Sequence, residues 1–131
     1  MVVDRAKKRC EYCQSQMIIV VSMELDHIVP ESTGGETVAE NLCLACAGCN
    51  AHKYNFESGI DPETNIETAL FHPRRQSWDD HFCWSKNGTM IIGLSPCGRA
   101  TVARLRMNRR DVVKSRSLWV SVGWHPPVDA Q

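Results

Sequence analysis

The sequence lacks any apolar run long enough to cross a bilayer. Its strongest aliphatic run, Met17 to Val21, is far shorter than the about 20 residues that a membrane-spanning helix needs. The basic N-terminal segment, residues 1–13, is not followed by the apolar core of a secretion signal. We therefore expect a cytoplasmic protein without a membrane partner. Internal repeats and low-complexity segments are also missing, which excludes solenoid and fibrous architectures.

The sequence also has no net charge, since 15 Lys and Arg balance 15 Asp and Glu. The balance hides an uneven distribution. Residues 1–71 hold five Lys and Arg against eleven Asp and Glu, whereas residues 72–131 hold ten against four. An acidic first half suits a cation site and a basic second half suits a polyanionic partner. Ordinary solvated surface charge produces such splits as well, so the distribution supports a nucleic-acid partner without establishing it.

Secondary-structure signals predict an α+β protein. The Ile- and Val-rich residues 18–30 favour a strand, Gly34-Gly35 favours a turn, and residues 45–55 favour a helix of two to three turns. Residues 57–80 resemble a connector, because Pro62 and Pro73 limit helix formation there.

The remaining segment, residues 81–131, has signals of its own. Asn87-Gly88 between apolar runs predicts a β-hairpin. Ser95-Pro96 is typical of a helix start, and a further helix is expected over residues 109–118. We expect this hairpin and helix extension to pack on the first part of the chain.

Four of the seven cysteines form two C-x-x-C pairs, Cys10 with Cys13 and Cys46 with Cys49. Four thiolates in two such pairs are the ligand set of a structural Zn²⁺ site. The alternatives are a redox C-x-x-C or unrelated buried thiols. A zinc ion here would fasten residue 10 to residue 49 and so fix the segment between them.

That segment carries candidate residues for phosphodiester hydrolysis. His27 is suited to be the general base, because imidazole changes its charge in the physiological pH range. Asp26 offers a hard oxygen ligand for Mg²⁺, and Asn50 offers a second, neutral one. Adjacent strand residues point to opposite faces, so we expect the strand to end or bulge at Asp26. Glu24 shares the face of Asp26 and could assist the metal, and His52 is a rival ligand to Asn50.

Several separated motifs together resemble one family. The run ELDHIVP at residues 24–30, the Gly-Gly turn, NLCLAC at residues 41–46 and GCNAHK at residues 48–53 are similar to the HNH endonucleases that have a ββα-metal core and an added four-cysteine zinc site. The resemblance implies that residues 1–56 form this core. It implies that His27 is the base, that Asn41 orients the active-site loop or the imidazole, and that the third motif position binds metal.

This third position is Asn50 rather than His, which favours Mg²⁺ or Mn²⁺ as the catalytic ion over Zn²⁺. As in the family, the expected products are a 5′-phosphate and a 3′-hydroxyl. A monomer with one site would nick DNA, and a homodimer could cut both strands. The expected phosphate contacts are basic side chains on and after the helix, although each could equally be a solvated surface charge: Lys53, Arg74, Arg75, Arg99 and Arg104.

Two other functions stay open from the sequence. One is a non-catalytic zinc-stapled module that binds nucleic acid, and the other is an RNase with similar residues. The adjacent Asp26 and His27 argue against the binding module, because binding alone needs no base beside a hard metal ligand. The RNase ranks below the DNA endonuclease only because of the family resemblance.

Overall fold

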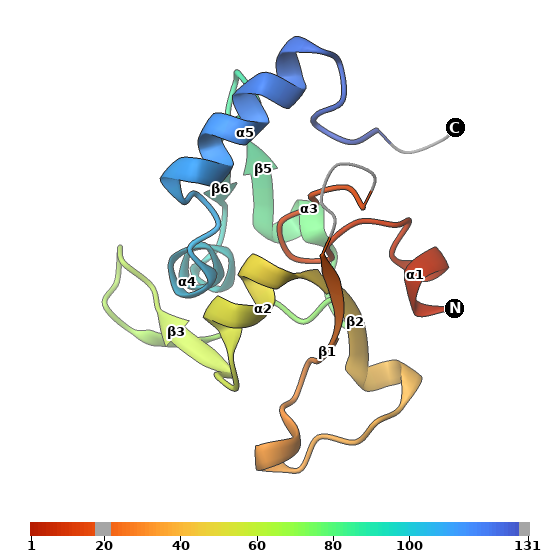
Figure 1. Cartoon of the computed structure of the whole chain (residues 1–131). Helices are drawn as coiled ribbons and strands as arrows, with labels where there is room; N and C mark the ends of the chain where they lie inside the picture. The colour runs from red at the N-terminus through yellow and green to blue at the C-terminus, as the bar shows by residue number, and fades with distance from the viewer. Residues whose placement is uncertain (18–21, 129–131) are drawn as a thin grey trace.

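The computed structural model describes residues 1–17 and 22–128 (Figure 1). The strand signal over residues 18–21 lies outside the described residues. Helices and short strands alternate along the chain, which confirms the predicted α+β class. The elements are α1 (Val2–Arg5), β1 (Met23–His27), η1 (Glu31–Thr33), η2 (Ala39–Asn41), β2 (Leu42–Cys46), α2 (Ala47–Lys53), β3 (Ser58–Ile60), β4 (Glu67–Ala69), α3 (Trp78–His81), β5 (Phe82–Trp84), β6 (Ile91–Gly93), α4 (Pro96–Leu105) and α5 (Arg110–Ser121).

Strands β1 and β2 and helix α2 form the first structural unit. β1 pairs antiparallel with β2 in a regular register that runs from Met23 opposite Cys46 to His27 opposite Leu42. The expectation that the strand ends or bulges at Asp26 is therefore wrong, because the ladder continues through His27. Helix α2 starts directly after β2, where the Cys46 side chain accepts a hydrogen bond from the Cys49 backbone N–H. This thiol takes the role that an oxygen-bearing side chain usually has at a helix N-cap.

Residues 57–80, which we expected to be a connector, contain a second hairpin. β3 pairs antiparallel with β4, from Ser58 opposite Ala69 to Ile60 opposite Glu67. This hairpin lies against α4 so closely that a Cβ atom at Gly59 would stand 3.1 Å from both the Ala100 carbonyl oxygen and Arg104 Cβ. The proline pattern correctly excludes a long helix here, but it does not exclude short extended segments.

The C-terminal elements match their sequence signals. β5 and β6 form the hairpin predicted around Asn87-Gly88. The Ser95 hydroxyl caps α4 by accepting a hydrogen bond from the Gly98 backbone N–H, and Pro96 occupies the first turn. Helix α5 is held by Arg116, whose fully buried guanidinium donates to the Thr89 and Met107 carbonyl oxygens.

A hydrophobic core joins the two halves of the chain. Its buried members include the four paired cysteines and Tyr12 from the first half, and Phe82, Ile91, Leu105 and Met107 from the second. Trp78 Nε1 also donates a 2.7 Å hydrogen bond to the Tyr12 carbonyl oxygen. As Figure 1 shows, α2 lies between the β1–β2 hairpin and α4. The basic C-terminal elements are thus placed beside the helix that carries Asn50. None of the helices described here is both long and apolar enough to pass through a membrane.

Candidate metal centre and active site

The four paired cysteines converge on one point. The Sγ atoms of Cys10, Cys13, Cys46 and Cys49 all lie within 4.8 Å of one another, and all four side chains are buried. The Sγ atoms of Cys13 and Cys46 are 3.7 Å apart. A tetrahedral Zn²⁺ with Zn–S bonds of about 2.3 Å requires S–S edges of about 3.8 Å. The Cys13–Cys46 pair matches this edge, and the whole cluster is compact enough for the four sulfurs to share one ion.

The backbone and the protonation of these thiols also fit a cation. In each C-x-x-C knuckle the second cysteine's backbone N–H points at the first cysteine's sulfur, at 3.4 Å in both cases. Hydrogen bonds from the neighbouring thiols lower the pKa of Cys13 well below its usual value, because they stabilise its thiolate. Burial raises the pKa of Cys10 instead.

The buried face of β1 holds an ion pair behind the predicted active site. Asp26 is 5% exposed, and Lys53 on α2 is 1% exposed. Lys53 Nζ lies 3.2 Å from Asp26 Oδ2 and also donates to the His27 carbonyl oxygen at 3.1 Å. The Tyr12 hydroxyl donates to the same carboxylate oxygen at 2.8 Å. The ion pair therefore connects the cysteine knuckle, β1 and α2.

Cys43 completes this network from β2. It lies opposite Asp26 in the strand pairing, and its Sγ is 3.7 Å from Asp26 Oδ2. Burial, followed by the nearby Asp26 charge, raises the pKa of Cys43 to about 12. The thiol therefore stays protonated at neutral pH and can donate to the carboxylate.

Asn50 contacts Glu24 rather than Asp26. Its amide Nδ2 donates to a Glu24 carboxylate oxygen. Glu24 and Asp26 share one face of β1, and Asn50 and Lys53, three positions apart on α2, share the helix face opposite. The interface of β1 and α2 therefore includes an exposed polar contact between Asn50 and Glu24 and buried contacts from Lys53 to Asp26 and to the His27 carbonyl oxygen.

His27 points to the other face of β1, because side chains alternate along a strand. Its Nε2 lies 2.9 Å from the Thr37 hydroxyl, and its Nδ1 lies 3.9 Å from a Glu31 carboxylate oxygen. The side chain is 26% exposed, so the ring is open to solvent on one side. The described contacts bring His27 to Thr37 and Glu31; they do not bring its ring to Asp26 or Asn50.

Asn41 holds the loop that follows His27. Its Oδ1 accepts a hydrogen bond from the Val29 N–H, and its Nδ2 donates to the Val29 and Glu36 carbonyl oxygens. Gly35 packs so closely on this clasp that a Cβ atom there would overlap the Val29 carbonyl oxygen. Such contacts are those expected of a residue that orients the active-site loop, and the effect of Asn41 on catalysis stays a prediction.

A comparison of the sequence with models of known protein families gives a match. The family model "HNH endonuclease" matches residues 10–56, the segment from the first knuckle cysteine to just beyond α2. Residues 10–56 are therefore similar to the HNH endonuclease family. Searches of the curated proteins and of the solved structures returned no match to the chain. The resemblance inferred from the separated motifs is therefore confirmed for the HNH segment.

Three of the predicted phosphate contacts are occupied by other partners. Lys53 is buried against Asp26. Arg74 pairs with Glu11, and Arg99 makes two 2.9 Å hydrogen bonds to the Asp61 carboxylate, which hold the pKa of Asp61 down to about 2. Each of these three cations is therefore already paired inside the fold. Phosphate contacts by all five residues, Arg75 and Arg104 included, remain predictions.

Sequence reasoning missed four residues around the site. Tyr12 and Cys43 contact Asp26, and Thr37 and Glu31 contact the His27 ring. Tyr12 had a recognisable signal, because it lies inside a knuckle whose backbone the metal fixes. The others approach the site only through the pairing of β1 with β2 and through the loop between them.

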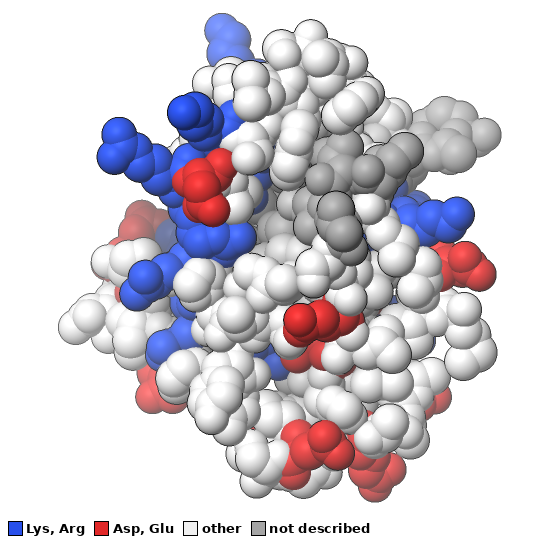
Figure 2. Space-filling view, viewed as in Figure 1, with Lys and Arg blue, Asp and Glu red and all other residues white. Residues whose placement is uncertain are grey.

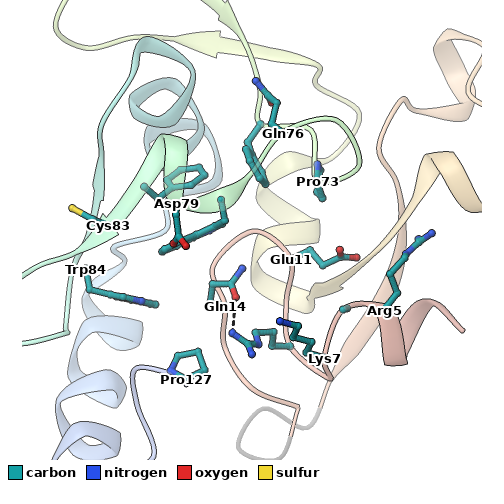
Figure 3. Close-up of a pocket in the computed structure, with 15 residues that line it drawn as sticks. Arg5, Lys7, Glu11, Gln14, Pro73, Gln76, Asp79, Cys83, Trp84 and Pro127 are labelled. Atoms are coloured by element: carbon teal, nitrogen blue, oxygen red, sulfur yellow. Dashed lines mark hydrogen bonds between the residues drawn. The ribbon is translucent and has the colours of Figure 1, made fainter. Parts of the chain in front are cut away.

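A cavity of about 530 Å³ lies away from this site (Figure 3). Glu11 and Gln14 of the first knuckle face Asp79 and Trp84 across it. Of the described residues that line it, none is among those predicted to act in catalysis.

Proposed function

We propose that the chain is a metal-dependent endonuclease that hydrolyses DNA phosphodiester bonds and leaves 5′-phosphate and 3′-hydroxyl ends. The observation that carries the proposal is the position of His27. Within the segment that matches the HNH endonuclease model, a solvent-open imidazole stands at the end of β1. Four converging cysteines fasten the N-terminal knuckle to the end of β2, the strand paired with β1, and to the start of α2.

The contacts of His27 suit a general base. A carboxylate near Nδ1 favours the tautomer in which Nδ1 carries the proton, which leaves the Nε2 lone pair free to accept one. The Thr37 hydroxyl now occupies the position next to Nε2, at hydrogen-bond distance. A water molecule at the same place would lose its proton to Nε2 as it attacks phosphorus. The proton then resides on the imidazolium, beside the Glu31 carboxylate.

The oxygen donors near Asn50 fit a hard divalent cation by their chemistry. Asp26 and Glu24 on β1 and the Asn50 amide on α2 supply carboxylate and carbonyl oxygens, which Mg²⁺ and Mn²⁺ prefer. We propose that Asp26 and Asn50 hold the ion and that Glu24 assists. When bound, the ion would stabilise the negative charge that develops on the phosphate. The Asp26 carboxylate is already paired with Lys53, so it would have to contact the ion and the Lys53 ammonium at the same time. Glu24, whose described contact is with Asn50, is not paired with Lys53 in this way.

The proposal is tested with supercoiled plasmid DNA and the zinc-loaded chain. We expect nicked circles in Mg²⁺ or Mn²⁺ and no cleavage after excess EDTA. Linear product that rises with the square of protein concentration would indicate a homodimer, and nicked product alone would indicate a monomer. A chain that binds the plasmid but leaves it intact with every divalent ion would be the non-catalytic binding module. Faster cleavage of an RNA of the same sequence would make it an RNase.

The metal ligands are tested by two isosteric variants of the carboxylates. Asp26→Asn and Glu24→Gln each remove one negative charge and keep the side-chain volume. If Asp26 is the main ligand, the Mg²⁺ concentration for half-maximal cleavage should rise about tenfold or more in Asp26→Asn and less in Glu24→Gln. The reverse order would assign the ion to Glu24 and Asn50. If this Mg²⁺ concentration is unchanged in both variants, neither carboxylate belongs to the metal site.

A further inference from the structure

A second surface hollow borders α2 on the side away from β1. This groove, of about 630 Å³, is formed where the end of α2 and the segment after it meet β3 and the C-terminal part of α4. We call it the α2–α4 groove. Its lining residues are Ala51, His52, Tyr54, Phe56, Ile60, Ala103, Arg104 and Arg106.

The groove is cationic. The described residues that line it include two arginines and no carboxylate. Burial first, and then the charges of Arg109 and Arg106, lower the pKa of His52, so His52 adds no positive charge of its own at neutral pH. Figure 2 shows that Lys and Arg side chains gather on the flank formed by α4 and α5, with a few acidic side chains among them, and that the lower end of this face carries acidic side chains without that basic cluster. This flank is therefore suited to an anion.

The same groove exposes apolar and aromatic surface. Tyr54 is 72% exposed, Phe56 is 44% exposed and Ile60 is 45% exposed. One such residue on a surface means little, but three in one hollow mark a binding site. The Arg104 guanidinium stacks on the Phe56 ring at 3.9 Å, and its Nε donates to the Ser58 carbonyl oxygen at 3.3 Å. Arg104 is thus fixed in place, and the Tyr54 ring is left open.

A cationic wall beside an open aromatic ring matches the two parts of a nucleotide. Guanidinium groups bind the phosphate, and a ring with a free face stacks on a base of any sequence. A fully paired duplex cannot use the ring, because its bases are stacked inside the helix. An apolar peptide, in turn, would offer no negative charge to the two arginines.

We propose that the α2–α4 groove binds an unpaired nucleotide of the DNA substrate, with its base on Tyr54 and its phosphate on Arg106. The inference rests on the proposed function, because it assigns the groove to the same DNA strand that the HNH site cuts. Asn50 and His52 lie on the same helix, about 200° apart around its axis. A helix about 10–12 Å across with its side chains corresponds to roughly three nucleotides at 3.4 Å of rise each. The enzyme would accordingly prefer DNA that is locally unpaired a few nucleotides from the cut.

The experiment measures binding and does not depend on cleavage. Fluorescence anisotropy with the full zinc-loaded chain, without added Mg²⁺ or Mn²⁺, compares two labelled duplexes of equal length. One is fully paired, and the other has a central bulge of three unpaired thymidines. Stacking of one base predicts that the wild-type chain binds the bulged duplex about tenfold more tightly. Tyr54→Ala should bring the two affinities together, and Tyr54→Phe should retain the preference, because it keeps the ring.

The matched control is Trp124→Ala, which removes another exposed aromatic side chain outside the groove; Trp124 is 55% exposed. It should leave the preference unchanged. For the phosphate, Arg106→Gln should lower the slope of log affinity against log salt by about 0.9. Circular dichroism shows whether each variant has the wild-type fold. If Tyr54→Ala does not fold, Tyr54→Phe still tests whether the ring carries the preference.

The outcomes separate the groove from the nuclease activity. Equal wild-type affinity for both duplexes, or equal loss of preference in Trp124→Ala and Tyr54→Ala, would overturn the groove inference even if the chain cleaves plasmid. A preference that depends on the Tyr54 ring, in a chain that cleaves nothing, would support the groove and overturn the nuclease proposal. A chain that binds neither duplex would overturn the groove inference, and the plasmid assay decides the nuclease proposal separately.

Discussion

The buried ion pair between Asp26 and Lys53 offers a quantitative test of how the HNH segment is held together. Lys53 Nζ is 3.2 Å from Asp26 Oδ2, and neither side chain is more than 5% exposed. At this distance the gross attraction is about 5 kcal/mol for an effective dielectric constant of about 20. Desolvation of the two charges offsets much of it, so the net value of the pair is small while the cost of breaking it is large.

Asp26→Asn leaves the Lys53 ammonium buried without a neutralising charge. Loss of one member of a buried pair costs about 3–5 kcal/mol. That is about a fifth or more of the total stability of about 5–15 kcal/mol typical of a domain. Lys53→Met should cost a similar amount, because it leaves the Asp26 carboxylate buried with the Tyr12 hydroxyl and the Cys43 thiol as its remaining partners. The double variant should recover most of the loss, since no unpaired charge remains.

Urea unfolding of the zinc-saturated chain, followed by far-UV circular dichroism, measures these differences. The control is Glu63→Gln, which also converts a carboxylate to an amide in an ion pair. Glu63 is 67% exposed and lies 2.6 Å from Arg99 Nε. Because solvent screens such a pair, we expect a loss below about 1 kcal/mol.

Two results would refute the reasoning. A loss in Asp26→Asn no larger than that in Glu63→Gln would mean that the pair is hydrated in solution. If the losses of unfolding free energy in the two single variants add up in the double variant, Asp26 and Lys53 act independently, which contradicts the contact between them.

Three further predictions concern the zinc cage, the C-terminal segment and the active-site loop. Cys46→Ser should release the zinc, giving close to no metal per chain by elemental analysis against about one in wild type, and should unfold at lower urea. Burial and then the Arg116 charge lower the pKa of His125 to about 4, below its usual 6.5, so the unfolded chain takes up the proton first as pH falls. Stability should therefore fall between pH 6.5 and about 4, and less steeply in His125→Phe, as thermal unfolding across this range would show. Gly35→Ala should lose roughly 1–3 kcal/mol and slow cleavage while zinc stays bound, because its Cβ displaces the Val29 carbonyl from Asn41.

Features with a local sequence signal were predictable. The two C-x-x-C pairs identified the metal cage, because each pair has the fixed spacing of a metal-binding knuckle. The fold only had to bring the two knuckles together across the long segment between them. The turn at Asn87-Gly88 and the cap at Ser95-Pro96 specify their own backbone conformations, and the structure has a hairpin and a helix at these places.

Features that depend on distant partners were not predictable. Lys53 is a charged residue at the end of a helix, and such a residue is usually solvated. Its burial follows from the position of Asp26, 27 residues earlier, on the strand that packs against α2. Arg99 similarly meets Asp61 only because the β3–β4 hairpin packs on α4. The sequence shows that these charges exist, and the tertiary fold decides which of them remain free for DNA.

The central claim, that His27 removes the proton from the attacking water, is tested most directly by chemical rescue. The rate of nicking of a supercoiled plasmid in Mg²⁺ is measured under single-turnover conditions for wild type and His27→Ala, each with and without added imidazole. Loss of the base should slow cleavage by about 10²–10⁴-fold, and imidazole should restore part of the rate in His27→Ala alone, because the side chain opens to solvent. Cleavage by His27→Ala at the wild-type rate would contradict the account.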